Sequence, residues 1–309
     1  MKNVVFLGND EGAVQRVFAL GRYERVQGLG EVVEGIVHGD CLEKHRADLA
    51  GVRYAFSTWG MPTLTEEEIK EYFPSLECVF YAAGSVQAFA RAFLKCGVRV
   101  FSAWAANALP VAETVFAQIT LANKGFFHTF LPDTYQKKLD AALAFQGNFS
   151  TNVGIIGAGK IGSLVAAKLR SLNVNVLVCD PFLSDERAKS LGMRKVGLQE
   201  LFEQCDVVSN HLADNENTRG MLGYDCFSRM KERAVFINSG RGRQVVEAEL
   251  ARALSEVPTR FAILDVTYPE PPQADNPLCS MSNVLLTPHI DGSWGNEVVR
   301  MAYCMIEAF

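Results

Sequence analysis

The segment that most constrains the fold is "NVGIIGAGKIGSLVAAKL" at residues 152–169, near the middle of a 309-residue chain. An apolar run of strand character precedes the pattern GxGxxG, and a run with helical apolar spacing follows it. In a dinucleotide-binding unit the first glycine permits a tight turn, the second admits a pyrophosphate to the backbone, and the third packs helix against strand. The segment therefore predicts a phosphate cradle built on Gly157, Gly159 and Gly162.

An acidic residue follows the cradle at the spacing that ribose binding requires. The next apolar run ends in Asp180, 18 residues after Gly162. A carboxylate there accepts hydrogen bonds from a ribose diol and repels a 2′-phosphate, so the pattern predicts NAD rather than NADP. An FAD site uses the same fingerprint, usually near the N-terminus, and stays open as an alternative, as do glycines that merely turn the chain.

Composition excludes several classes of partner. The net charge is −5 without a basic run, which argues against nucleic acid or an anionic membrane as the main partner. No apolar run approaches the roughly 20 residues that span a bilayer. The eight cysteines are scattered without paired or metal-ligand spacing, which indicates core residues in a reducing compartment, with the cytoplasm as the default and no metal site expected.

Short apolar runs alternate with helical patterns on both sides of the cradle, which predicts βαβ units and parallel sheets. At this length two domains are expected. We expect two doubly wound α/β domains: a Rossmann-like cofactor domain over residues 106–296, inserted in a flavodoxin-like domain of residues 1–105 and 297–309. In the first part of the chain the expected strands are 4–8, 53–58, 78–84 and 98–104, and the expected helices are 65–73, 86–97 and 107–125, with Pro110 in the first turn of the last helix.

Three later apolar runs each finish in a charged or titratable side chain. "AVFINSGRG" ends in Arg241, "FAILDVTYPE" passes Asp265 to reach Glu270, and "NVLLTPH" ends in His289. Ligands of an open parallel sheet bind outside the carboxyl ends of its strands, where the nicotinamide half of the cofactor would also lie. We therefore expect these side chains to converge there.

An arginine, a glutamate and a histidine together suit one reaction. Hydride transfer to a ketone requires a proton for the developing alkoxide, and histidine is suited to deliver it at neutral pH. A neighbouring carboxylate favours the imidazolium, and a guanidinium can hold a substrate carboxylate while polarising the adjacent carbonyl. The set predicts interconversion of a 2-keto acid and a 2-hydroxy acid. Taken singly, a helix-capping arginine, a surface glutamate and a core histidine are the structural alternatives.

The chain resembles the D-isomer-specific 2-hydroxyacid dehydrogenases, the family of D-lactate, D-glycerate and phosphoglycerate dehydrogenases. The resemblance is carried, in family order, by "GIIGAGKIG" with Asp180, "CDVVSNHL", "INSGRG", "LDVTYPEPP" and "NVLLTPH". It implies a substrate-binding domain first, an inserted NAD-binding domain, and a small 2-hydroxy or 2-keto acid substrate. It also implies that Arg241 binds the substrate and that Glu270 and His289 form the acid–base pair.

The resemblance implies further contacts. "YAAGSV" matches the family's glycine loop, so the backbone amides of Ala83 and Gly84 are candidates to hold the substrate carboxylate. The helix at 107–125 and the polar arm after it resemble the family's dimerisation region, which implies a homodimer. The implied cofactor contacts are Gly157, Gly159, Lys160, Ile161, Gly162, Asp180, His211, Leu212, Asn217, Asn238, Ser239, Asp265, which would face the nicotinamide, and His289.

The chain departs from the family in one loop that borders the cofactor. "NHLADN" has Ala213 and Asn215 where the family commonly has proline and threonine, and His211 in this loop is expected to be structural rather than catalytic. Two other functions stay open. An NAD-sensing corepressor of the same fold retains similar residues, and formate dehydrogenases share the fold but pair the histidine with glutamine, so that Glu270 argues against the latter.

Overall fold

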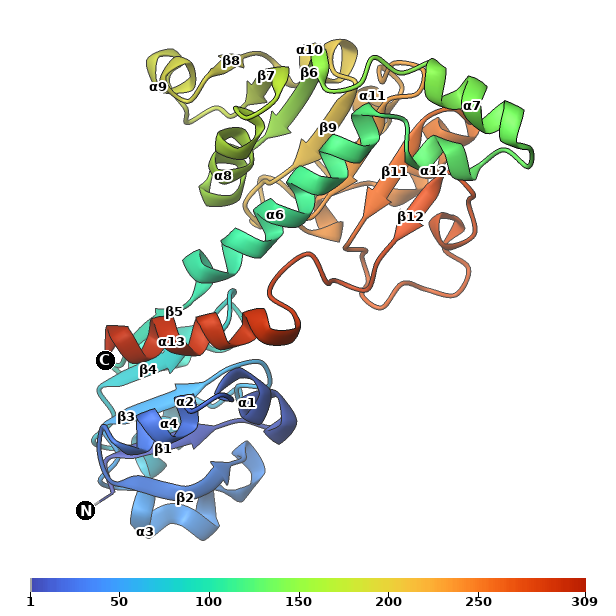
Figure 1. Ribbon diagram of the computed structural model, residues 1–309. Helices are drawn as coiled ribbons and strands as arrows, with labels where there is room; N and C mark the ends of the chain where they lie inside the picture. The colour runs from blue at the N-terminus through green and yellow to red at the C-terminus, as the bar shows by residue number, and fades with distance from the viewer. Residues whose placement is uncertain (1) are drawn as a thin grey trace. The chain divides into compact units, whose positions relative to one another are not determined.

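The computed structural model describes residues 2–309, and the chain divides into two compact units (Figure 1). Unit 1 is Met1–Ala108 with Ser293–Phe309, and unit 2 is Leu109–Gly292. Each unit is built on one sheet in which every strand pair is parallel, with helices on both faces. The expected fold class is therefore confirmed.

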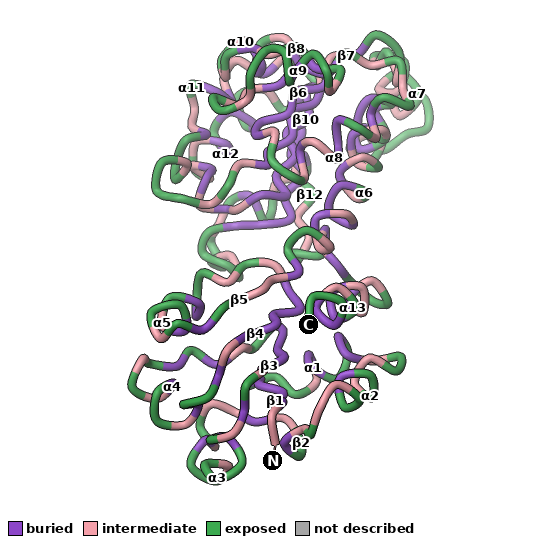
Figure 2. Tube along the Cα trace, turned by 90° about the vertical axis from the view of Figure 1, so that its left-hand side faces the viewer, coloured by how far each residue is buried: buried purple, intermediate pink, exposed green. Residues whose placement is uncertain are grey.

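Unit 1 carries a five-stranded sheet in the order β2-β1-β3-β4-β5, the flavodoxin-like arrangement. Its strands are β1 (Val4–Leu7), β2 (Val32–Val37), β3 (Tyr54–Ser57), β4 (Cys78–Tyr81) and β5 (Arg99–Ser102). Successive side chains of a strand point to opposite faces, so Val4 and Phe6 enter one core cluster while Val5 and Leu7 enter the other. Figure 2 shows the buried strands between more exposed helices.

The helices of unit 1 divide between these two cores. On one face lie α1 (Glu11–Val17), α2 (Arg22–Gln27) and α13 (Val299–Ala308), which follows the 3₁₀ turn η5 (Gly295–Val298). On the other face lie η1 (Gly39–His45), α3 (Arg46–Leu49), α4 (Glu66–Tyr72) and α5 (Ala90–Lys95). The C-terminal helix α13 packs against β4 and β5, so the end of the chain completes the unit in which the chain began.

Unit 2 carries a seven-stranded sheet in the order β12-β11-β10-β9-β6-β7-β8. Its strands are β6 (Phe149–Ile156), β7 (Asn173–Cys179), β8 (Met193–Lys195), β9 (Val207–Asn210), β10 (Val235–Asn238), β11 (Phe261–Leu264) and β12 (Val284–Leu286). The chain proceeds from β6 towards β8 and then returns to β9 on the other side of β6. The strand order therefore reverses between β6 and β9, and ligands of doubly wound sheets bind at the carboxyl ends beside such a switch point.

Two apolar cores cover the faces of this sheet. One face carries α6 (Trp104–Asn123), whose first residues belong to unit 1, together with α8 (Lys160–Leu169) and α9 (Asp185–Ser190). The other face carries α10 (Leu198–Gln204), α11 (Tyr224–Phe227) and α12 (Glu247–Glu256). The remaining elements are η2 (Phe127–Phe130), α7 (Tyr135–Leu143), η3 (Gly242–Gln244) and η4 (Pro277–Cys279). No helix within residues 2–309 has both the length and the apolar character needed to cross a membrane.

The structure corrects one local prediction and adds elements that the patterns did not predict. Pro110 lies inside α6 rather than in its first turn, because the helix begins at Trp104, where the backbone N–H bonds the Ser102 hydroxyl at 3.3 Å. The strand β2 was not predicted. Its apolar alternation is interrupted by exposed Glu34 and by Gly35, which has a positive φ of 76°. The short helices α1, α2 and α3 were also not predicted.

Candidate active site

The glycine-rich turn between β6 and α8 has the geometry that the pattern predicts. Gly157 has a φ of 87°, and a Cβ on it would lie 2.7 Å from the His211 carbonyl oxygen. A Cβ on Gly162 would lie 2.1 Å from the Gly157 oxygen, so the helix packs against the turn too closely for a side chain. A Cβ on Gly159 would meet nothing within 4 Å, which leaves open space above the N-terminus of α8. The turn therefore fits a pyrophosphate.

Asp180 lies at the end of β7 and its carboxylate holds the turn in place. One oxygen accepts the Ala158 N–H at 2.7 Å and the other accepts the Phe182 N–H at 2.8 Å. The carboxylate is half-buried, and each oxygen keeps a lone pair for a ribose hydroxyl. The acid thus joins the cradle to the position where the adenosine ribose would lie, and the residues present fit a dinucleotide.

The loop after β9 borders the cradle. His211 is buried, its ring Nε2 lies 2.9 Å from the Ser209 hydroxyl, and burial lowers its pKa to about 4. Its imidazole is therefore neutral at neutral pH. Leu212 packs against the core, whereas Asn217 is exposed, with its N–H bonded to the side chain of Asn215. On the opposite side of the cradle Lys160 is exposed and Ile161 is half-buried.

Polar side chains fix the loop that carries Arg241. Asn238, at the end of β10, accepts the Gly240 N–H at 3.1 Å, and Asn210 bridges Asn238 and Gln244 through its amide group. The fully buried Gln244 also accepts the Arg241 N–H at 3.2 Å. The sequence patterns did not identify Gln244, although an amide three residues after the arginine is a local signal for such a contact.

The guanidinium of Arg241 is half-buried, and its one hydrogen bond within residues 2–309 is to the Gly240 carbonyl oxygen at 2.7 Å. Its loop lies directly against the segment after β11, because a Cβ on Gly242 would meet the Thr267 backbone at 2.1 Å. This close approach requires glycine after the arginine and brings the Arg241 loop beside the strand end that leads to Glu270.

Asp265 organises the loop that carries His289. Its buried carboxylate accepts the Thr287 hydroxyl at 2.7 Å and the Ile290 N–H at 2.7 Å, and its backbone oxygen accepts the His289 N–H at 3.0 Å. His289 has a positive φ of 56°, so these bonds hold its backbone in a region that non-glycine residues seldom adopt. Both Asp265 and His289 are therefore fixed at the strand ends.

His289 and Glu270 form a contact pair. The ring Nδ1 lies 2.7 Å from Glu270 Oε1, and the two side chains are 45% and 41% exposed. A carboxylate on Nδ1 sets the ring orientation and leaves Nε2 as the nitrogen available to a ligand.

The strand register places all of these groups at one edge. Asn238, Leu264 and Leu286 are aligned across the neighbouring strands β10, β11 and β12. The segments carrying Arg241, Glu270 and His289 leave the sheet directly after these residues, at its carboxyl edge.

One residue of this edge was missed by the sequence analysis. Asp291, two positions after His289, is 2% exposed and accepts a hydrogen bond from the Ser239 hydroxyl. Burial, the largest effect, and the nearby Asp265 raise its pKa to about 6. The only local signal was an acidic residue in "HIDGS", because its partners lie far away in the chain.

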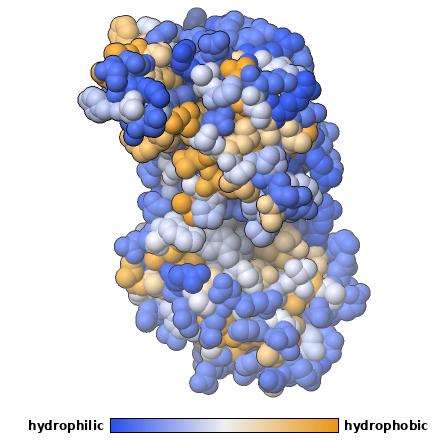
Figure 3. Space-filling model, turned by 90° about the vertical axis from the view of Figure 1, so that its right-hand side faces the viewer, coloured by the Kyte–Doolittle hydropathy of each residue, from blue (hydrophilic) through white to orange (hydrophobic). Residues whose placement is uncertain are grey.

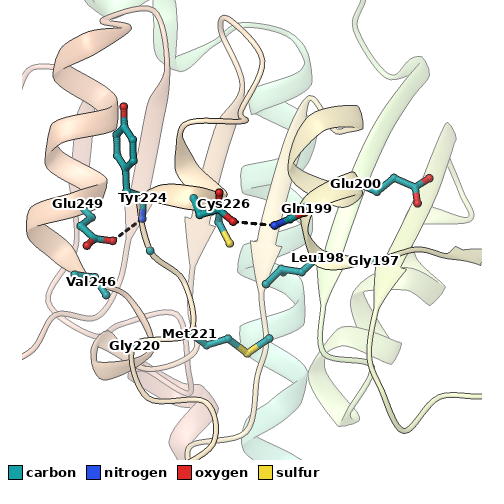
Figure 4. A pocket seen from close by; sticks show the side chains of 12 residues that line it. Gly197, Leu198, Gln199, Glu200, Gly220, Met221, Tyr224, Cys226, Val246 and Glu249 are labelled. Atoms are coloured by element: carbon teal, nitrogen blue, oxygen red, sulfur yellow. Dashed lines mark hydrogen bonds between the residues drawn. The ribbon is translucent and has the colours of Figure 1, made fainter.

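A pocket of about 730 Å³ also opens at the carboxyl edge of unit 2 (Figure 4). It lies between the N-terminal ends of α10, α11 and α12, and helices of parallel sheets begin where strands end. Figure 4 shows the Glu249 carboxylate reaching the Tyr224 N–H, a bond of 2.5 Å. Its lining residues are Gly197, Leu198, Gln199, Glu200, Gly220, Met221, Gly223, Tyr224, Asp225, Cys226, Val246 and Glu249.

This pocket is separate from the polar residues that follow β10, β11 and β12. Burial raises the pKa of the Cys226 thiol in its wall, with a smaller contribution from Cys179, the residue before Asp180. None of the cradle glycines and neither Asp180 nor the Arg241, Glu270 and His289 side chains line this pocket.

The two remaining predicted site residues, Ala83 and Gly84, lie in unit 1. Ala83 and Gly84 follow β4, and their carbonyl oxygens accept the Ser102 hydroxyl at 3.0 and 2.5 Å. Within a trans peptide the N–H points away from the carbonyl, so the amides of Gly84 and Ser85 face away from Ser102.

Comparison with known proteins gives a family for the chain. Residues 130–291, just over half of the chain, match the model of the D-isomer specific 2-hydroxyacid dehydrogenase NAD-binding domain, which identifies NAD as the cofactor. The chain is similar to D-3-phosphoglycerate dehydrogenase of Archaeoglobus fulgidus, 33% identical over 64% of this chain and 37% of that protein. It is also similar to glyoxylate reductase of Korarchaeum cryptofilum, 35% identical over 52% of this chain and 48% of that protein.

Solved structures share the fold. The holo form of Rhodotorula graminis D-mandelate dehydrogenase has a TM-score of 0.80 and 19% identity, over 99% of this chain and 93% of that one.

The matches to the D-3-phosphoglycerate dehydrogenases of Archaeoglobus fulgidus and Bacillus subtilis cover only 37% and 39% of those proteins. From the match over residues 130–291, this chain belongs to the D-isomer specific 2-hydroxyacid dehydrogenase family.

Proposed function

We propose that this protein transfers a hydride between NAD(H) and C2 of a small 2-hydroxy or 2-keto acid. The observation that carries the proposal is the His289–Glu270 pair at 2.7 Å, held at the same sheet edge as Arg241 and across the switch point from Asp180. The cofactor supplies the hydride when it is bound. Side chains of this chain bind the substrate, polarise its carbonyl group and transfer the proton.

In the proposed reduction the Arg241 guanidinium binds the substrate carboxylate with two hydrogen bonds and polarises the adjacent carbonyl. His289 Nε2 delivers a proton to the carbonyl oxygen as it becomes an alkoxide. Glu270 accepts a hydrogen bond from Nδ1–H of His289 and so orients the ring with Nε2 towards the substrate. In the oxidation direction the same Nε2 removes the hydroxyl proton.

The two units take different roles in this proposal. Unit 2 binds NAD through the cradle and Asp180. Unit 1 is the substrate-binding domain in this proposal, and the backbone amides of Ala83 and Gly84 are its candidates to hold the substrate carboxylate. All eight cysteines are free thiols, which supports a reducing compartment such as the cytoplasm.

We also propose a homodimer formed through the arm that follows α6. Apolar side chains of this arm are exposed: Phe126, Phe130, Leu131, Tyr135, Leu139, Leu143 and Phe149. Contiguous exposed apolar patches of this kind mark interaction surfaces. Figure 3, which faces the side from which α7 projects in Figure 1, shows apolar patches there.

The proposed reaction is tested by NADH oxidation with pyruvate, glyoxylate, hydroxypyruvate and bulkier 2-keto acids. We expect turnover with at least one of them. The variant His289→Asn should lower kcat by roughly 10²- to 10⁴-fold while NADH binding is retained. His45→Asn, on the 3₁₀ turn η1 of unit 1, is the matched control and should be unaffected. NADH binding without turnover of any keto acid would refute the proposal.

A further inference from the structure

Asp291 is a buried acid that the proposed mechanism does not use. Its carboxylate accepts the Ser239 hydroxyl and, at 3.2 Å, the Gln118 side-chain amide, while its backbone N–H donates to the Asp265 carboxylate at 2.9 Å. It therefore contacts α6, the loop that carries Arg241 and the end of β11. A side chain that is 2% exposed and tied to three elements has a defined position.

This position brings two buried carboxylates together without a cation. Asp265 is 3% exposed, and its charge raises the pKa of Asp291 further after the effect of burial. No lysine or arginine within residues 2–309 forms an ion pair with either acid. Because the pKa of Asp291 is about 6, the carboxyl group is mostly ionised near neutral pH, although burial disfavours the charge. Hydrogen bonds from neutral donors offset only part of the cost of burying a charge, and buried groups with a shifted pKa concentrate at functional sites.

The surroundings of Asp291 accept either charge state. The Gln118 amide donates to the carboxylate, while its own oxygen is buried without a partner in the described structure. Rotation of the amide would present that oxygen to a protonated Asp291, or to an asparagine at the same position. The geometry is therefore compatible with the acid and with its neutral isostere.

The position of Asp265 and Asp291 in the sheet indicates which positively charged group of a ligand would lie near them. Asp180 lies on one side of the switch point, so the adenosine half of a dinucleotide lies there and the nicotinamide half extends over β9 to β12. Asp265 and Asp291 follow β11 and β12 at this same edge. The nicotinamide ring is positively charged in NAD⁺ and neutral in NADH.

We propose that Asp291, together with Asp265, makes the nicotinamide end of the site anionic, so that the chain binds NAD⁺ in preference to NADH. This inference rests on the proposed function, because it takes the cofactor to be bound in the orientation given above. Asp291 acts on the charged ring through space and is a determinant of cofactor redox preference rather than a group that moves a proton.

The test measures dissociation constants of NAD⁺ and NADH for the full chain by calorimetry, without a substrate. Asp291→Asn should weaken NAD⁺ binding roughly tenfold or more and change NADH binding little. Loss of one charge within about 12 Å of the ring has at least that effect at an effective dielectric constant of about 20. Asp206→Asn is the matched control, because Asp206 precedes β9 at the opposite end of the sheet. It removes the same net charge and should leave the ratio of the NAD⁺ and NADH dissociation constants unchanged.

A second measurement follows the dissociation constants of NAD⁺ and NADH as a function of pH. The wild-type preference for NAD⁺ should fall between pH 7.5 and pH 5, as Asp291 takes up a proton. The charged or titratable groups near Asp291 are Asp265 and His289, and His289 is paired with Glu270. All three are present in both proteins, so the difference between wild type and Asp291→Asn isolates Asp291.

The outcomes separate the two proposals. If neither nucleotide binds the wild type, the proposed function fails and this inference fails with it. If both bind but Asp291→Asn leaves their ratio unchanged, or Asp206→Asn changes it equally, only the inference is overturned. If Asp291→Asn does not fold, Asp291→Ser takes its place in both comparisons. An NAD⁺/NADH ratio equal to that of the wild type, or a wild-type ratio that stays constant with pH, then overturns the inference.

Discussion

Replacing Asp291 by asparagine should stabilise the folded protein at neutral pH. Burial first, and the charge of Asp265 second, raise the pKa of Asp291 from 3.8 to about 6. The folded state therefore binds this proton more tightly than the unfolded chain does. As the pH rises from about 4 to about 6, the wild type loses stability through this group, and the loss is complete above the folded pKa.

The magnitude follows from the size of this shift. A difference of about 2 pKa units corresponds to about 3 kcal/mol of unfolding free energy, which is a large part of the stability of an ordinary domain. Asparagine is nearly isosteric, carries no charge, and can accept from Ser239 and donate to the unpartnered Gln118 oxygen. The variant should therefore avoid most of the loss of unfolding free energy that the wild type shows above pH 6.

Urea unfolding followed by circular dichroism from pH 4 to pH 8 measures this effect. The free-energy difference between Asp291→Asn and wild type should be small at pH 4, grow to about 3 kcal/mol by pH 7, and stay constant above that. Other titrating groups are common to both proteins and cancel in the difference. A difference that is independent of pH, or that grows towards acid, would refute the assignment of a buried, ionised carboxylate.

Four further predictions concern the proposed site and interface. Glu270→Gln should lower kcat for reduction with NADH affinity retained, because the His289 ring loses the carboxylate that orients it; an unchanged kcat would show that the contact has no part in the reaction. Arg241→Gln should lower kcat/KM for the keto acid by roughly 10²-fold or more with NADH affinity retained; loss of NADH binding instead would place the arginine at the cofactor. Asp180→Ala should relax the preference for NADH over NADPH by roughly tenfold, measured as a ratio of kcat/KM, and full discrimination in the variant would contradict ribose recognition by this acid. Phe130→Glu, at a side chain that is 68% exposed, should shift the protein from dimer to monomer in light scattering, whereas Leu94→Glu on unit 1, 58% exposed, should not; a dimeric Phe130→Glu protein would argue against this interface.

The sequence predicted the parts of the fold that depend on strong local patterns. Gly157 and Gly162 lie where a Cβ would collide with backbone, so their identity alone indicated the turn. The strands of the cofactor unit read as continuous apolar runs because both of their faces are buried. The edge strand β2 was missed because Glu34 and Gly35 break its alternation.

The candidate site was predictable where residues follow strand ends and unpredictable where contacts join distant segments. Arg241, Glu270 and His289 stand directly after apolar runs, so a parallel sheet brings them to one edge. Asp291 was missed because its environment is built by Gln118 and Ser239, which lie 173 and 52 residues away in the chain. Contacts with residues so distant in the chain leave no pattern in the sequence around Asp291.

The most direct test of the proposed chemistry is a crystal structure of the protein with NADH and oxamate, an unreactive analogue of a 2-keto acid. We expect two hydrogen bonds from the Arg241 guanidinium to the oxamate carboxylate, and His289 Nε2 within hydrogen-bonding distance of the oxygen that stands for the reacting carbonyl. Oxamate bound at the nicotinamide away from both side chains would contradict the proposed mechanism.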